Sequence, residues 1–321
     1  MVGSPQEPRG HPETPERSPD DKGGSNGPLH DGIIMAARVT IGCSTERAGT
    51  SVSRMAGWQL KMGDDGTVST YAELEKDGLP IAIGVAWSSS ALEGLPGDFD
   101  GHRCFGRDKE GAIHADTKCQ HTHEFVIPLP DAVALRADIP FKWVLLNWNP
   151  SGHIPPGIYD LPHFDVHFEM GPIAEAFAIE PGPCGPELVR CDQFLKARKP
   201  LPPNYVPPDY VDVEAVVPVM GNHLIDTTGR EFQKEPFTRS WIYGVYDGKE
   251  IFYEAMVARA HLLSKPDGCS TIKAPKAVAV SGFYPAEYCV RHNAKTGEYS
   301  VSMEKFERRD ASARDAVRSK G

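Results

Sequence analysis

The stretch from His163 to Glu169 alternates ionisable and apolar side chains over seven residues. A period of two is that of a β-strand, in which successive side chains point to opposite faces. As a strand it would place four ionisable groups on one face, namely His163, Asp165, His167 and Glu169. The chain must therefore build a sheet that buries the apolar face of this strand and leaves its ionisable face to solvent, to paired groups or to a ligand.

Composition supports a sheet protein, because 31 glycines and 29 prolines among 321 residues interrupt long helices and favour short strands joined by turns. Asp247-Gly248 is a strong hairpin signal between two apolar runs. We expect an all-β fold with minor helices, of β-barrel or β-sandwich type, with Pro-rich crossover loops such as residues 196–210. The expected strands are residues 67–74, 80–87, 141–148, 163–169, 241–246, 250–256, 276–281, 287–292 and 299–306, and the expected helices are residues 172–179 and 255–263.

Three segments are expected: a disordered tail at residues 1–35, a single β-rich domain with a metal site at residues 36–308, and a flexible tail at residues 309–321. A net charge of −10 without a long basic run argues against nucleic-acid binding. We find no apolar stretch of about 18 residues, as a membrane-spanning helix needs, and no signal peptide. The chain is therefore predicted to be cytoplasmic, with its seven cysteines as free thiols.

Strand geometry limits which of the ionisable side chains between His163 and Glu169 can bind the same metal ion. Residues i and i+2 lie roughly 6.6 Å apart along a strand, and residues i and i+4 roughly 13 Å. Because metal–ligand bonds are only about 2.0–2.2 Å, His163/Asp165 or Asp165/His167 can share one ion, whereas His163 and His167 need a bulge to do so. The other interpretation is a strand with an apolar core face and a solvated polar face.

Two further segments offer ligands. His223 closely follows Gly221 in an apolar, strand-like run, and glycine allows a sharp turn that aims a side chain. Glu254 would share a strand face with Phe252 and Met256, and a carboxylate on an apolar face must be paired, hydrogen-bonded or bound to a metal.

Other candidates are less regular in spacing. His121 and His123 have the i, i+2 spacing that lets two imidazoles reach one metal. His153 stands in a Gly/Pro-rich loop and could line the mouth of a pocket. As catalytic residues we predict Asp165, Glu169 and His153, which would move protons or orient ligands beside the ion.

Three blocks of sequence carry a resemblance to a known family. They are Gly152-His153-x-Pro-Pro-Gly-x-Tyr159-Asp160-x-Pro162-His163-Phe164-Asp165-x-His167-Phe168, Met220-Gly221-x-His223, and Tyr246-Asp247-Gly248 followed by Phe252-x-Glu254-x-Met256. Together they resemble an uncharacterised bacterial β-rich family, loosely similar to cupins. The resemblance implies a metal site that combines strand histidines with a later histidine, and relatives that are usually exported.

The sequence therefore predicts a mononuclear metal-dependent enzyme that acts on a small organic molecule, most readily by O₂-dependent oxidation. The ion would be Fe, Cu, Mn or Zn, and the predicted ligands are His163, His167, His223 and Glu254, with His121 and His123 as a further pair. Alternatives are a zinc-dependent hydrolase or lyase, a metal-free cyclase or isomerase, and a non-catalytic small-molecule-binding or ring-forming assembly protein. The predicted partner is a small-molecule substrate, with no nucleic acid and no membrane, and the chain could form a homo-oligomer.

Overall fold

The computed structural model describes residues 50–97 and 122–312, together with the backbone of short strands between residues 34–47 and 105–115. These residues belong to one unit, Gly32–Gly321. Most of the regular structure is β, in two large sheets whose strands run antiparallel, apart from one short parallel pair at the edge of the first sheet.

Sheet A carries the ionisable strand near its middle. Its strands, in order across the sheet, are β1 (Ile34–Met35), β9 (His123–Pro128), β10 (Trp143–Asn149), β11 (His163–Glu169), β16 (Lys249–Ala258), β15 (Arg239–Tyr246), β14 (Gly221–Asp226) and β13 (Tyr210–Val217).

Sheet B is built mainly from the two ends of the described chain. Its strands, in order, are β17 (Asp267–Thr271), β18 (Gly282–His292), β19 (Tyr299–Arg309), β6 (Pro80–Trp87), β5 (Gly66–Leu74), β4 (Thr50–Met62) and β2 (Ala37–Arg38), with β3 (Gly42–Arg47) also paired to β4. The remaining short strands are β7 (Phe105–Arg107), β8 (Ile113–Ala115) and β12 (Pro181–Cys184).

Helices are short and lie in the connections. They are α1 (Asp131–Ala134), α2 (Ile173–Phe177), α3 (Cys191–Ala197) and α4 (Arg259–Leu263), with 3₁₀ turns η1 (Ser89–Leu92), η2 (Pro203–Tyr205) and η3 (Arg230–Gln233). Among the described residues, none of these helices is long and apolar enough to cross a membrane.

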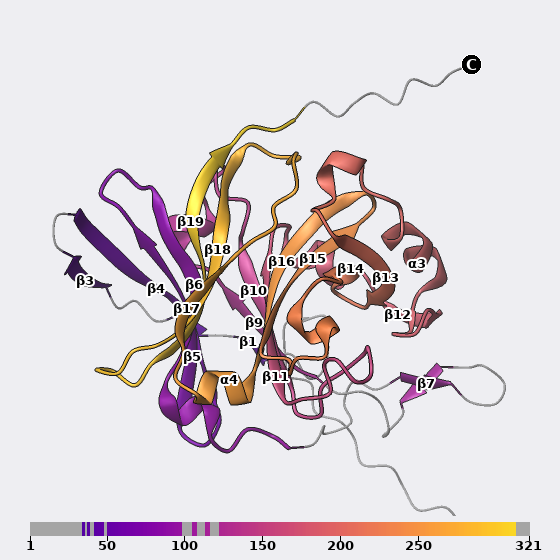
Figure 1. Ribbon diagram of the computed structural model, residues 1–321, viewed down its shortest axis with the longest axis horizontal. Helices are drawn as coiled ribbons and strands as arrows, with labels where there is room; N and C mark the ends of the chain where they lie inside the picture. The colour runs from indigo at the N-terminus through magenta and orange to yellow at the C-terminus, as the bar shows by residue number, and fades with distance from the viewer. Residues whose placement is uncertain are drawn as a thin grey trace, which may run out of the picture. The chain divides into compact units, whose positions relative to one another are not determined.

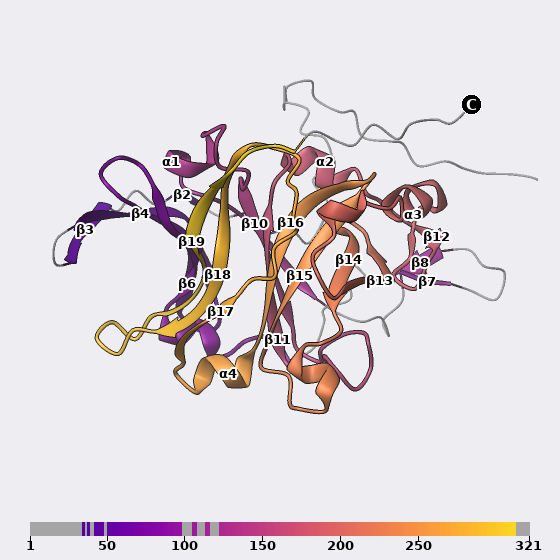
Figure 2. The same cartoon turned by 45° about the horizontal axis from the view of Figure 1, so that its top comes forward.

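One hydrophobic core joins the two sheets, which lie on the left (β4–β6, β18, β19) and right (β10–β16) of Figures 1 and 2. Its centre is aromatic: the rings of Trp87 and Phe164 lie 5.3 Å apart, and those of Trp241 and Tyr288 lie 5.0 Å apart. Burial of each such side chain contributes about 1.5–3 kcal/mol, so the apolar residues of β11 anchor it against sheet B. The ionisable face of β11 therefore points away from sheet B.

The mostly β fold with minor helices is confirmed, but the sheets do not close into a barrel, because each keeps its own two edge strands. The Asp247-Gly248 hairpin is confirmed and joins β15 to β16. The strand expected at residues 276–281 is wrong, since these residues connect β17 to β18, with Ala277 and Val278 buried in the core. Burial of a loop explains that error, because a buried loop and a strand present similar apolar residues.

The expectation of free thiols is also wrong for four cysteines. Disulfides join Cys184 to Cys191 and Cys269 to Cys289, while Cys43, Cys104 and Cys119 lie outside the residues whose side chains are described. The sequence alone did not show that β17 pairs with β18, which places Cys269 directly opposite Cys289.

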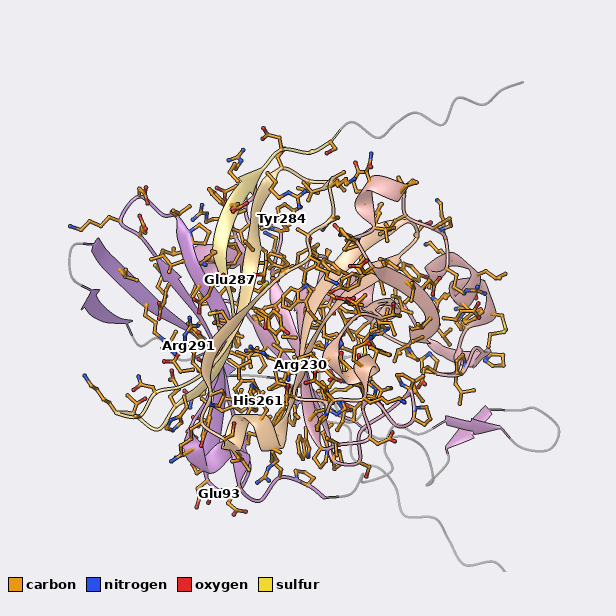
Figure 3. The ribbon with its side chains drawn as sticks, in the orientation of Figure 1. Glu93, Arg230, His261, Tyr284, Glu287 and Arg291 are labelled. Atoms are coloured by element: carbon orange, nitrogen blue, oxygen red, sulfur yellow. A yellow bond between two sulfur atoms is a disulfide. The ribbon has the colours of Figure 1, made fainter. Side chains whose placement is uncertain are left out.

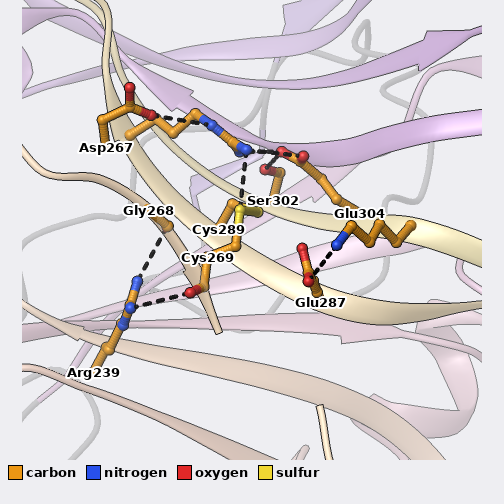
Figure 4. The surroundings of a disulfide bond; sticks show 10 residues. Arg239, Asp267, Gly268, Cys269, Glu287, Cys289, Ser302 and Glu304 are labelled. Carbon is orange, nitrogen blue, oxygen red and sulfur yellow. Dashed lines mark hydrogen bonds and ion pairs between the residues drawn. A yellow bond between two sulfur atoms is a disulfide. The ribbon is translucent and has the colours of Figure 1, made fainter. Parts of the chain in front are cut away.

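The second disulfide lies in a dense polar network (Figure 4). Arg291, on β18 with Glu287 (Figure 3), donates from Nη2 to Sγ of Cys269 at 3.0 Å and also binds Glu304. Cys269, Cys289 and Glu304 lie close enough to ligate a metal ion, but the sulfurs bond each other and the carboxylate binds an arginine. This cluster is therefore structural.

Candidate metal centre

Five strands of sheet A position the polar face. On β11, His163, Asp165 and His167 point to this face, opposite Asn149, Asn147 and Leu145 of β10. On the other side of β11, His167 lies directly opposite Glu254 of β16. Because β11 pairs with both neighbours in unbroken register, its side chains keep strict alternation, and all seven of its residues are buried.

The outer group consists of His153, His163 and Asp165, each of which offers one ligand atom within 4.8 Å of the others. His163 Nε2 lies 3.1 Å from Asp165 Oδ1, and His153 Nε2 lies 3.3 Å from Asp165 Oδ2. Asn149 Nδ2 donates to the same Oδ2 at 2.7 Å and holds the carboxylate in place. The side chain of His153 is 29 % exposed, which opens this group to solvent.

The inner group consists of His167, His223 and Glu254, again with ligand atoms within 4.8 Å of one another. His167 Nε2 lies 3.6 Å from Glu254 Oε2, and these side chains are only 1 % and 2 % exposed. The rings of His167 and His223 pack edge-on against Phe252, with centroids 4.8 and 5.3 Å from it.

Two glycines make these arrangements possible. Gly244 of β15 lies opposite both His223 and Phe252, and a Cβ there would come within 2.1 Å of the Phe252 ring. In the loop before β11, Gly152 has φ +73°, and a Cβ there would lie 2.1 Å from the backbone of Tyr159. This close approach lets the loop fold back, so that His153 reaches Asp165.

All four histidines are held in the same tautomer. The Nδ1 atoms of His153, His163, His167 and His223 lie 2.6–3.1 Å from backbone carbonyl oxygens, of Ile154, Leu161, Leu145 and Ala215 respectively. A carbonyl oxygen only accepts hydrogen bonds, so each Nδ1 carries a proton and Nε2 is the ring atom placed to bind a metal. Histidines that bind metals are held in this way, with the other ring nitrogen donating to a carbonyl or carboxylate.

The same face carries several buried acceptor atoms that have no hydrogen-bond partner among the described residues. They are Asn147 Oδ1, His163 Nε2, Asp165 Oδ1, Glu169 Oε1 and Glu254 Oε2. Asp165, Glu169 and Glu254 form no ion pair with a described lysine or arginine. The imidazoles of His153 and His163 lie beside Asp165, and that of His167 lies beside Glu254. Buried carboxylates require pairing or a metal, so a cation fits this set of lone pairs.

Electrostatics differ between the two groups. In the outer group, burial alone would lower the pKa of His153, but the Asp165 carboxylate outweighs it and raises that pKa. Burial alone would raise the pKa of Asp165, but the adjacent imidazoles of His163 and His153 hold it well below its usual value. This carboxylate is therefore ionised at neutral pH.

In the inner group, burial lowers the pKa of both His167 and His223 to about 4, so both rings are neutral at pH 7. Burial, followed by the nearby charges of Asp165 and Glu169, raises the pKa of Glu254 well above its usual value. Burial does the same to the pKa of Glu169, which belongs to neither group.

The predicted site residues are thus divided between two groups. The structure brings His167, His223 and Glu254 together, but places His163 with Asp165 and His153. His123 begins β9 and is in neither group, and His121 lies outside the described residues. Sequence reasoning missed Asn149 as the support of Asp165, because only the pairing of β10 with β11 places it there.

In comparisons with protein-family models, curated proteins and solved structures, none matches this chain.

Proposed function

We propose that this chain is a metal-dependent enzyme that acts on a small organic molecule, with a divalent ion in the outer group. The observation that carries the proposal is the shared orientation of the histidines: each Nδ1 donates a hydrogen bond to a carbonyl oxygen, so that Nε2 faces a buried carboxylate and is the ring atom placed to bind an ion. In this proposal His153, His163 and Asp165 are the ligands.

The donor set suggests the chemistry. Two imidazoles and one carboxylate leave coordination positions free, the arrangement that non-haem Fe(II) oxygenases use. The exposed side of His153 gives a substrate access to those positions. The first reaction class is therefore O₂-dependent oxidation, with O₂ as the oxidant.

A second candidate, zinc-dependent hydrolysis, is favoured by the same observation, because two histidines and a carboxylate also form catalytic zinc sites. There the ion would lower the pKa of bound water and supply the nucleophile. We further propose that the two sheets form a sandwich with a cupin-like placement of the histidines on strands, and that the protein can assemble as a homo-oligomer.

Elemental analysis of protein purified without a histidine tag tests metal binding. We expect a stoichiometric transition metal or zinc, and a loss of the ion of the outer group in Asp165→Asn. His292→Gln is the matched control, because His292 lies on β18 and contacts Tyr299 rather than either group. Protein that binds no Fe²⁺, Mn²⁺, Cu²⁺ or Zn²⁺ would overturn the proposal.

The reaction class is then tested with metal-free protein reloaded with one ion at a time. We expect the Fe²⁺ form to consume O₂ with one member of a panel of phenols, thiols and 2-oxo acids. Turnover of ester or phosphoester substrates by the Zn²⁺ form, without O₂ consumption by the Fe²⁺ form, would select the second candidate.

A further inference from the structure

We infer that the inner group holds a second divalent ion, separate from the ion of the outer group. The inference rests on the proposed function, since both ions would bind the same face of sheet A. It changes the expected stoichiometry from one ion per chain to two.

Strand geometry requires separate ions. The register of β11 with β10 and β16 is unbroken from His163 to His167, so no bulge brings these two residues together. Along such a strand they lie roughly 13 Å apart at Cα. Two atoms bound to one ion by bonds of about 2.1 Å lie at most about 4.2 Å apart, and the two rings belong to different groups of ligand atoms.

The inner group has a full donor set of its own. His167 Nδ1 donates a hydrogen bond to the carbonyl oxygen of Leu145 at 3.1 Å, and His223 Nδ1 donates to that of Ala215 at 2.7 Å, so both Nε2 atoms are available to bind a metal. Glu254 Oε2 lies 3.6 Å from His167 Nε2 and has no hydrogen-bond partner in the described part of the chain, although its side chain is only 2 % exposed.

An ion in the outer group would not provide a partner for the buried carboxyl group of Glu254. That ion would bind Asp165 and leave Glu254 buried beside His167 and His223. Because a buried carboxyl group without a hydrogen-bond partner is costly, an ion in the inner group removes a penalty that the outer ion leaves in place.

The two ions should exchange at different rates. The outer group reaches solvent through His153, whose side chain is 29 % exposed. The inner group is enclosed, with His167 and Glu254 only 1 % and 2 % exposed. A chelator should therefore remove the outer ion quickly, and the inner ion only when the sheet face opens.

The test is a titration of the metal-free, tag-free full chain with Co²⁺, followed by removal of Co²⁺ with EDTA. We expect two equivalents to bind, and a fast and a slow phase of removal. Glu254→Gln should lose one of the two equivalents together with the slow phase, and His153→Ala should lose the other with the fast phase. His292→Gln should keep both, and circular dichroism verifies the fold of each variant.

A single equivalent that His153→Ala removes would overturn the second ion and leave the proposed function standing. Two equivalents that Glu254→Gln retains in full would also overturn the assignment. A titration in which no Co²⁺ binds would overturn both proposals, because neither group of histidines and carboxylates would then hold an ion. If Glu254→Gln does not fold, His223→Gln replaces it with the same expected loss.

Discussion

Replacement of Glu254 by glutamine should stabilise the metal-free protein. The carboxylate is buried, and its Oε2 has no hydrogen-bond partner among the described residues. A buried unsatisfied polar group costs about 1–3 kcal/mol, and more when it is charged. Because burial raises the pKa of Glu254, folding at neutral pH requires this carboxyl to bind a proton, whereas glutamine is neutral in both states. Glutamine also keeps the shape, so we expect a gain of about 1–3 kcal/mol, or about 2–12 °C in melting temperature for a domain of this size.

The same variant should respond less to metal. Each ion bound only by the folded state adds about 2.7 kcal/mol at a free concentration one hundred times its dissociation constant. Wild-type protein with an ion in each group would gain about twice that free energy of unfolding. The Glu254→Gln protein would gain only the stabilisation that comes from the ion of the outer group. The assay is thermal unfolding in EDTA and in saturating Co²⁺, with Glu287→Gln as a control, because its ion pair with Lys305 lies near the surface.

The opposite sign in EDTA would refute this reasoning. If Glu254 were paired with a protonated His167, its replacement would break a buried ion pair and cost about 3–5 kcal/mol. A metal-free Glu254→Gln protein that melts well below wild type would show that the group is a salt bridge built for stability.

Three further predictions concern Gly244, the pH dependence of stability and the β17–β18 disulfide. Gly244→Ala should cost about 1–3 kcal/mol, since the new Cβ would meet the Phe252 ring at 2.1 Å, and it should remove one Co²⁺ equivalent. In metal-free protein the melting temperature should fall as pH drops from about 6.5 towards 4. In that range histidines become protonated in the unfolded chain, whereas His167 and His223 stay neutral in the folded chain because their pKa is about 4. His223→Gln should therefore weaken the dependence of the melting temperature on pH. Alanine at both cysteines of the β17–β18 disulfide should lower stability by about 3 kcal/mol in thermal unfolding, whereas no change would show that the bond does not form.

Alternation along one strand and the residues of one turn could be interpreted correctly from the sequence, because both depend only on neighbouring residues. The alternation at His163–Glu169 gave a strand with one apolar and one ionisable face, and β11 has both. The Asp247-Gly248 turn set the β15–β16 hairpin, and this pairing kept Glu254 on the face shared with Phe252.

Pairing between distant segments decided the rest. His163 and His167 look alike in sequence, and only the neighbours of β11 divide them between two groups. His153 joins the outer group through the fold of a loop, for which periodicity gives no signal. The choice between barrel and open sheets likewise depends on edge strands whose partners the sequence does not specify.

The most direct measurement is anomalous X-ray diffraction at the Co absorption edge from crystals of Co²⁺-loaded protein. The account predicts two peaks on the polar face of sheet A, each at metal–ligand bonding distance, about 2.0–2.2 Å, from the donor atoms of one group. Well-ordered density for both groups without an anomalous peak at either, with water beside the histidine Nε2 atoms, would contradict it.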